Sequence, residues 1–88
     1  MKTKNGFVLR PLGKEYILVA EGLDAADASV LISMNESAAF LWKAVDGKDF
    51  DADTLINLLV EEYDITHEQA ERDINSLIQA WKNSNIIE

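Results

Sequence analysis

Hydrophobic positions recur along this chain with two different periods, and the change from one to the other divides it in two. Residues 7–10 and 15–20 are short apolar runs rich in β-branched and aromatic side chains, which is typical of strands. Pro11 and Gly13 lie between them and favour a turn, so we predict that the two strands pair as a hairpin. After a polar connection, residues 29–33 predict a third strand.

From Asn35 onward the apolar positions follow the period of a helix. Asn35 is a favoured N-cap residue, because its side-chain oxygen can accept an otherwise unpaired N–H of the first turn. Glu36 then places negative charge at the positive end of the helix. We predict a helix over residues 36–45 that stops near Gly47, with one buried stripe formed by Ala38, Leu41, Trp42 and Val45.

Two more helices are predicted after Gly47. Asp51 is placed to cap the second, whose broad apolar face holds Leu55, Ile56, Leu58, Leu59, Val60 and Tyr63. Thr66 and Gln69 have the spacing of a capping box, in which the two side chains bond each other's backbone N–H. The seam of the third helix comprises Ala70, Ile74, Leu77, Ile78 and Trp81. Residues 83–85 end it, and Ile86-Ile87 follows as an apolar tail that adds a strand or packs on the core.

This order of elements predicts an α+β fold: a three-stranded antiparallel sheet followed by three helices, in a winged helix-turn-helix-like arrangement. The 88 residues, of which 48% are hydrophobic, suffice for one domain spanning residues 1–88 with a single modest core. Both tryptophans fall on helical seams, which favours core packing over ligand stacking.

Cysteine content and hydropathy indicate the cellular compartment of the protein. The chain contains no cysteine, which excludes disulfides and thiolate metal sites and fits a reducing cytosol. No apolar run approaches the roughly 20 residues that span a bilayer, and the basic N-terminus is not followed by a signal-peptide pattern. We therefore expect a cytoplasmic protein with no membrane partner.

Charge argues against nucleic acid as a partner. Sixteen acidic residues against eight basic ones give a net charge of −8, whereas phosphate contacts need clustered lysines and arginines. A winged helix would read DNA with its third helix, but only Arg72 and Lys82 are cationic there, against Glu68, Glu71 and Asp73. A DNA-binding winged helix is therefore the alternative hypothesis rather than the leading one.

The sequence contains no group of residues with the types and spacing of a catalytic site. His67 is the single histidine and lies among polar residues at a helix start, with no second His or Cys to complete a site. Glu61, Glu62 and Asp64 cluster at a helix end, but a calcium loop with its turn glycine is missing. The serines and glycines form no nucleophile elbow or phosphate loop. The chain is interpreted as a binding protein without cofactor, metal or catalytic residues.

Three segments resemble the PqqD family over nearly the whole chain. They are the run LISMNESAAFLW at 31–42; Asp46-Gly47 with LVEEYD at 59–64; and QAERDI at 69–74 leading to Ile86-Ile87. The resemblance implies a peptide-recognition element of a pathway that modifies ribosomally made peptides. Such a domain binds the leader of a precursor peptide and presents the core to a modifying enzyme, often a radical S-adenosylmethionine enzyme.

The resemblance also implies where the leader binds: as an added strand beside the third strand, in a groove shared with the third helix. Unpaired N–H and C=O groups at a sheet edge are ready to pair with such a strand. The side chains of Val30, Ile32 and Met34 are expected on one face of the strand, with Leu31 and Ser33 on the other. The helix residues expected at the groove wall are Glu71, Asn75, Ile78 and Lys82, although the sequence leaves open which flank of the helix faces the strand.

The same open edge supports a third hypothesis. An unprotected edge strand can pair with its own copy, and a two-fold dimer is the usual result. Self-pairing is compatible with leader binding, because it would occupy the same edge in the absence of a leader. A homodimer is therefore retained as a prediction to be tested alongside peptide binding.

Overall fold

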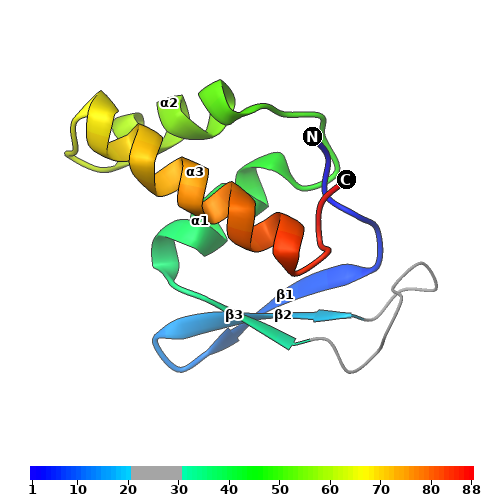
Figure 1. Cartoon of the computed structure of the whole chain (residues 1–88). Helices are drawn as coiled ribbons and strands as arrows, with labels where there is room; N and C mark the ends of the chain where they lie inside the picture. Colours follow the sequence, from blue (N-terminus) through cyan, green and yellow to red (C-terminus); the bar gives the residue numbers. More distant parts are fainter. Residues whose placement is uncertain (21–30) are drawn as a thin grey trace.

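The structure, a computed structural model, describes residues 1–20 and 31–88. A three-stranded sheet forms one layer and three helices pack on one of its faces (Figure 1). In chain order the elements are β1 (Phe7–Leu12), β2 (Glu15–Ala20), β3 (Leu31–Met34), α1 (Glu36–Val45), α2 (Ala52–Glu62) and α3 (His67–Asn83). This confirms the predicted α+β fold and the order of strands before helices.

The sheet is antiparallel with the strand order β1-β2-β3, so β1 and β3 are its two edges. β1 extends to Leu12, past the end that we predicted from Pro11. Proline is tolerated in an edge strand because its missing N–H can face away from the neighbouring strand. Gly13, at φ 63°, supplies the left-handed turn residue of the hairpin. The third strand ends at Met34, and the predicted positions 29 and 30 lie outside the described residues.

All three predicted helix caps are present. Each cap side chain accepts a hydrogen bond from the backbone N–H three residues later, which pairs a donor that the first helical turn leaves open. The pairs are Asn35 with Ala38 (2.9 Å), Asp51 with Thr54 (2.9 Å) and Thr66 with Gln69 (3.1 Å).

The capping box of α3 is only half formed. Thr66 caps the helix as predicted, but the Gln69 side chain does not return the bond. Its Nε2 donates instead to Asp73 Oδ1 at 2.9 Å, and its Oε1 accepts from Arg72 Nη2 at 3.1 Å. Gln69 is therefore engaged along the helix rather than at its start, because polar partners one turn on compete for its amide.

The core lies between the inner face of the sheet and the helices. Its largest fully buried side chains are Trp42, Leu18, Leu41, Leu55, Ile74 and Ile86. The rings of Trp42 and Trp81 meet edge to face with centroids 5.3 Å apart, and Phe50 meets Trp81 in the same way at 6.5 Å. Both tryptophans therefore serve the core, as their positions on the helical seams predicted.

The two termini lie side by side at one end of the molecule (Figure 1). Ile86 and Ile87 are buried, and Ile87 forms an isolated antiparallel bridge with Thr3. The N-terminal amine donates to the backbone oxygen of Phe50 at 2.7 Å. The apolar tail thus does both of the things that the sequence allowed: it packs on the core and pairs with another extended segment.

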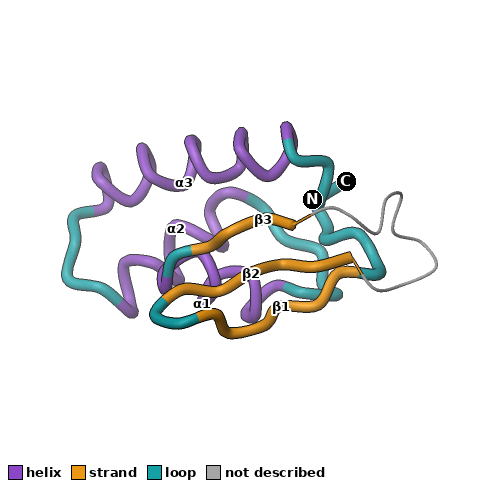
Figure 2. The backbone as a smooth tube through the Cα atoms, turned by 90° about the horizontal axis from the view of Figure 1, so that it is seen from below, coloured by secondary structure: helices purple, strands orange, loops and turns teal. Residues whose placement is uncertain are grey.

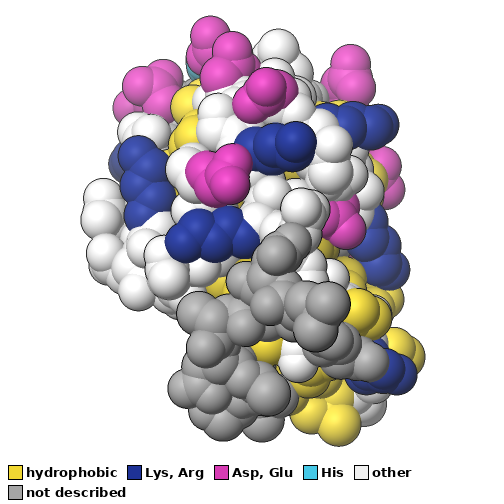
Figure 3. Space-filling view, turned by 90° about the vertical axis from the view of Figure 1, so that its right-hand side faces the viewer, with side chains coloured by type: hydrophobic (Ala, Val, Ile, Leu, Met, Phe, Trp, Pro, Cys, Tyr) yellow, Lys and Arg dark blue, Asp and Glu magenta, His cyan; other side chains and the backbone are white. Residues whose placement is uncertain are grey.

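Among the described elements, no helix lies over the outer face of the sheet. Figure 2 views the molecule from this side. Val8 and Leu12 of β1 are 41% and 61% exposed there, which is high for large apolar side chains. Seen from the end that holds the termini, acidic side chains gather over the helical layer and hydrophobic ones show at the sheet (Figure 3). Within the described ranges, no helix has the length and apolar character needed to cross a membrane.

Candidate binding groove

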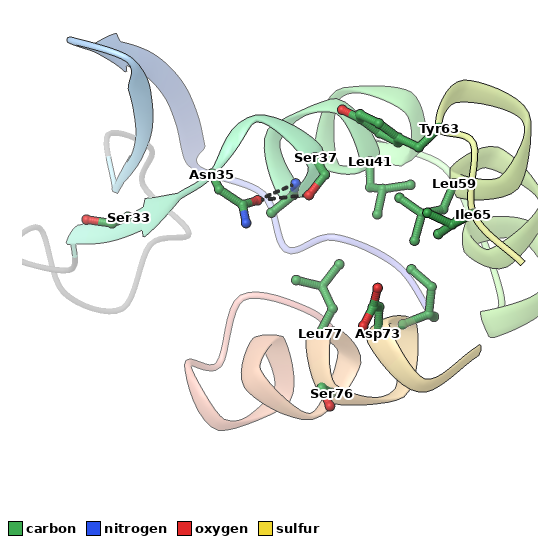
Figure 4. A pocket seen from close by; sticks show the side chains of 12 residues that line it. Ser33, Asn35, Ser37, Leu41, Leu59, Tyr63, Ile65, Asp73, Ser76 and Leu77 are labelled. Atoms are coloured by element: carbon green, nitrogen blue, oxygen red, sulfur yellow. Dashed lines mark hydrogen bonds between the residues drawn. The ribbon is translucent and has the colours of Figure 1, made fainter. Parts of the chain in front are cut away.

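A groove of about 640 Å³ opens where β3 runs into α1, with the end of α2 and one flank of α3 as its other walls (Figure 4). Three segments far apart in the sequence build it, within residues 33–41, 59–65 and 73–77. Its lining residues are Ser33, Asn35, Ser37, Ala38, Leu41, Leu59, Tyr63, Ile65, Asp73, Ile74, Ser76 and Leu77.

The lining combines an apolar floor with a hydroxyl-bearing and amide-bearing rim. Leu41, Leu59 and Ile74 are buried core residues that lie directly beneath the groove. Leu77 and Ile65 are half-buried, so they can still lose apolar surface to a ligand. Such an apolar cleft with a few polar groups around it is suited to an extended peptide with apolar side chains.

The Tyr63 side chain lies at the junction of α2 with the loop before α3. Its ring meets Phe40 edge to face with centroids 6.2 Å apart, which holds it against α1. Burial raises the pKa of the Tyr63 hydroxyl, and the charges of Glu36 and Glu62 raise it further. The hydroxyl is therefore neutral at physiological pH. Glu36 and Glu62 line a neighbouring cavity beside Tyr63, together with Lys43.

Asn35 joins the strand side of the groove to the helix side. Its Oδ1 accepts from the Ala38 N–H at 2.9 Å and from the Ser37 hydroxyl at 3.1 Å. Met34, directly before it, is buried in the core. The last residue of β3 and the first turn of α1 are thus held together, and the groove wall that they form is fixed from both sides.

The sheet register indicates which backbone groups of β3 face the open edge. Pro11 pairs with Tyr16 and has no N–H, so this pair fits a position without ladder bonds between β1 and β2. The backbone N–H and C=O of Tyr16 then point to β3, where the residue paired with Tyr16 is Met34. Because alternate residues of a strand bond to opposite sides, the N–H and C=O of Ser33 face away from β2, toward the groove. Among the described strands, none pairs with this edge.

The α3 wall of the groove is one flank of that helix. Figure 4 shows Asp73 and Leu77 pointing into the groove, whereas the Ser76 side chain points away from it. Asp73 and Leu77 are four residues apart and therefore lie one above the other on the same side of α3. This flank adjoins the buried seam that Ile74 belongs to.

The helix residues expected at the groove wall lie elsewhere on α3. Ile78 is a core residue, 8% exposed. Glu71, Asn75 and Lys82 are exposed on the other flank. At 3.6 residues per turn, the buried seam of α3 lies between this flank and the one that carries Asp73 and Leu77. None of the four is among the residues that line the groove. Their part in binding stays a prediction, and the geometry favours their neighbours.

Only some of the strand residues that were expected to bind the leader line the groove. Ser33 lines it, while Ile32 packs half-buried against the core and Met34 is buried there. Leu31 lies in β3 opposite Val19. Val30 lies outside the described residues. The expected alternation therefore holds for the described positions, with Ile32 and Met34 on the helix side and Ser33 exposed.

Most lining residues were not anticipated from the sequence as binding residues, notably Tyr63, Ile65, Asp73 and Leu77. One signal in the sequence indicates the flank of α3 that lines the groove. Leu77 extends the apolar seam toward one side, whereas the other side carries only polar residues beyond Ile78. An apolar residue at the margin of a seam is left half-exposed, and a half-exposed apolar residue is a favourable contact for a ligand.

The fold resembles that of two solved structures. One is "TbiB1 in Complex with the TbiA(beta) Leader Peptide", at 16% identity and a TM-score of 0.74, covering 100% of this chain and 95% of that chain. The other is "Lasso peptide synthetase B1 complexed with the leader peptide", at 20% identity and a TM-score of 0.71, covering 99% and 95%. At these identities the likeness establishes the fold.

The family is established separately. The model of the PqqD family, described as Coenzyme PQQ synthesis protein D, matches residues 15–87. The chain therefore belongs to the PqqD family. A comparison with curated proteins gave no match.

Proposed function

We propose that this protein is a non-catalytic adaptor that binds the leader of a ribosomally made precursor peptide and presents it to a modifying enzyme. The leader adds to β3 as a fourth strand and places apolar side chains in the groove between β3 and α3. Radical S-adenosylmethionine enzymes are the first class of partner to test, because the family resemblance favours them.

One observation carries this proposal: the open edge of β3 lies beside an apolar groove in a member of the PqqD family. An edge alone supplies main-chain hydrogen bonds, which carry affinity but no sequence preference. A groove alone supplies side-chain contacts without fixing the register of a peptide. The two together provide both, and both fold neighbours hold a leader peptide in their structures.

The roles of individual residues follow from their positions. Ser33 would exchange main-chain hydrogen bonds with the leader, because its backbone groups face the open edge. The half-buried Leu77 and Ile65 would contact an apolar leader side chain. Leu31 and Ile32 would contribute through the strand on which Ser33 lies. Asn35 would act indirectly, by holding the end of β3 against α1.

The test is a direct binding measurement with peptides from short reading frames encoded beside the gene. Each peptide is labelled with fluorescein and titrated with the protein while anisotropy is followed. Saturable binding of one leader supports the proposal, and silence on all of them contradicts it. A labelled DNA duplex titrated in parallel decides against the winged-helix alternative if its anisotropy stays flat.

Leu77→Arg is the first variant to compare in that assay. Replacing a half-buried leucine in the groove wall by a charged residue removes about 2 kcal/mol of apolar contact with the leader, or roughly thirtyfold in affinity. Asn75→Arg introduces the same charge on the opposite flank of α3 and is expected to leave affinity within about twofold. Equal losses in the two variants would contradict the placement of the leader in the groove.

Light scattering over a dilution series tests the predicted homodimer. If the β3 edge pairs with its own copy, the dimer must dissociate as leader is added, because both occupy one edge. A dimer that persists at saturating leader would place the self-contact on another surface.

A further inference from the structure

The groove contains one charged side chain, and it is acidic. Asp73 points from α3 into a lining that otherwise consists of apolar, hydroxyl and amide groups (Figure 4). Its Oδ1 accepts one hydrogen bond, from Gln69 Nε2 at 2.9 Å. Among the described residues, no lysine or arginine forms an ion pair with it. The neighbouring cation, Arg72, is turned to Gln69 Oε1 at 3.1 Å instead.

The groove lining supplies no positive charge that would neutralise Asp73. Glu36 and Glu62 line a neighbouring cavity beside Tyr63, and Lys43 lines that cavity too. Neither lysine nor arginine is found among the residues that line the groove itself. A ligand that brings positive charge to this end of the groove is attracted, and one that brings negative charge is repelled.

The spacing along α3 sets a spacing in the ligand. Asp73 and Leu77 are one turn apart, about 6 Å along the helix axis. Side chains on one face of an extended peptide recur every two residues, about 6.6 Å apart. Figures 1 and 2 both show α3 and β3 running along one another, so a strand added to β3 also runs along this flank of α3.

We propose that the groove selects peptide segments in which a lysine or arginine lies two residues from an apolar residue, with the apolar side chain on Leu77 and the cation on Asp73. This inference rests on the proposed function and specifies the chemistry of its substrate. An ion pair at the rim of a groove is worth little in absolute affinity but discriminates between peptides of equal apolar content. Asp73 is therefore a specificity-determining residue rather than the source of most of the affinity.

The experiment is a selection from a displayed library of random twelve-residue peptides. The library is panned against the wild-type protein, Asp73→Lys and the control Glu71→Lys. Glu71→Lys makes the same change of charge two residues away, on the other flank of α3. Wild type and Glu71→Lys are expected to enrich lysine or arginine two positions from an apolar residue, and Asp73→Lys to enrich aspartate or glutamate there.

The selected peptide then gives a quantitative test by anisotropy. Replacing its basic residue by glutamine is expected to weaken binding to the wild type about fivefold, and to change nothing for Asp73→Asn. The difference should shrink as salt is raised. Asp73→Asn also keeps a hydrogen-bond acceptor for Gln69, so it serves if the lysine variant folds poorly.

The outcomes distinguish failure of this inference from failure of the proposed function. Enriched peptides with apolar residues but no preferred charge overturn the inference and leave peptide binding standing. A charge preference that reverses equally in Glu71→Lys shows an effect of net charge alone, and overturns it too. If no peptide is enriched on the wild type, the proposed function and the inference fail together.

Discussion

The two edges of the sheet differ in what they offer to another chain. β1 is the longer edge, yet it carries Pro11, and its exposed apolar residues Val8 and Leu12 lie on the outer face of the sheet. β3 has only four residues, but Ser33 turns its backbone groups outward beside a lined groove. Length and exposed apolar surface would favour β1 as a binding edge, whereas hydrogen-bonding capacity and the adjacent groove support the proposal that the leader binds at β3.

The difference shows how a small sheet can have one open edge without aggregating at both. A proline on an edge strand removes a donor and hinders the approach of a second strand. β3 has only four residues, and a short edge strand offers few pairing positions to another chain. Four variants test this comparison, taken from the largest expected effect on the molecule to the smallest.

Ser33→Pro is expected to lower leader affinity by about a hundredfold, because it removes an edge N–H and places the proline ring in the path of the incoming strand. Ser33→Ala keeps the N–H and is expected to bind like the wild type. Anisotropy measures affinity, and circular dichroism shows that the fold is kept. A folded Ser33→Pro protein with unchanged affinity would contradict strand addition at β3.

Asn35→Ala is expected to cost about 1 kcal/mol of folding free energy through the lost N-cap, or roughly 4–8 °C in Tm. It should also weaken leader binding severalfold, because the end of β3 is no longer tied to α1. Asp51→Ala removes the cap of α2, whose N-terminus does not line the groove. Its leader affinity should be unchanged at temperatures where the protein is folded.

The stabilising effect of Asp51 should depend on pH. Hydrogen bonds from the Thr54 amide and hydroxyl lower the pKa of Asp51 below its ordinary 3.8. A carboxyl whose pKa is lowered by folding stabilises the protein above its unfolded pKa, and this contribution is lost as the pH falls through the folded value. The Tm deficit of Asp51→Ala should therefore be full at pH 7 and shrink below about pH 4.

The control for this titration is Asp51→Asn, which keeps a cap acceptor but cannot ionise. Its Tm should remain near that of the wild type at pH 7, and its difference from Asp51→Ala should be independent of pH. A deficit of Asp51→Ala that is constant from pH 7 to pH 2.5 would show that the charge of Asp51 plays no part.

Pro11→Ala should have the smallest effect. The change restores a backbone N–H at the β1 edge and is expected to leave leader affinity within about twofold, because the leader does not pair there. Anisotropy with the same leader checks this. Increased affinity in Pro11→Ala would indicate that the leader also pairs with the β1 edge.

Much of the fold was predictable because its signals are local. The caps at Asn35, Asp51 and Thr66 depend on residues three positions apart. The hairpin depends on a turn of two residues, with Gly13 in a conformation that other residues rarely adopt. Even so, Pro11 was taken as the end of a strand that in fact continues to Leu12. A proline can continue a strand that lies at the edge of a sheet. Whether a strand lies at an edge depends on the arrangement of the whole sheet, and not on the residues next to the proline in sequence.

The candidate site was predictable at the level of its elements, and less so at the level of its residues. The pairing of β3 with α3 as groove walls came from the family resemblance, and the groove lies between them as expected. The flank of α3 that lines it was not predicted, since Glu71, Asn75 and Lys82 lie on the opposite side. The apolar seam of a helix identifies which side of the helix is buried. It does not show which of the two margins of the seam faces the groove.

By itself, the sequence determined the order of strands and helices, the N-caps and most of the core. Each of these depends on residue type and on spacing along the chain. Only the tertiary structure decided that Asp73 and Leu77, rather than their neighbours, face β3, and that the backbone of Ser33 is turned to the groove. Those facts depend on the rotation of α3 about its axis and on the register of three strands. Both are set by packing between segments distant in sequence.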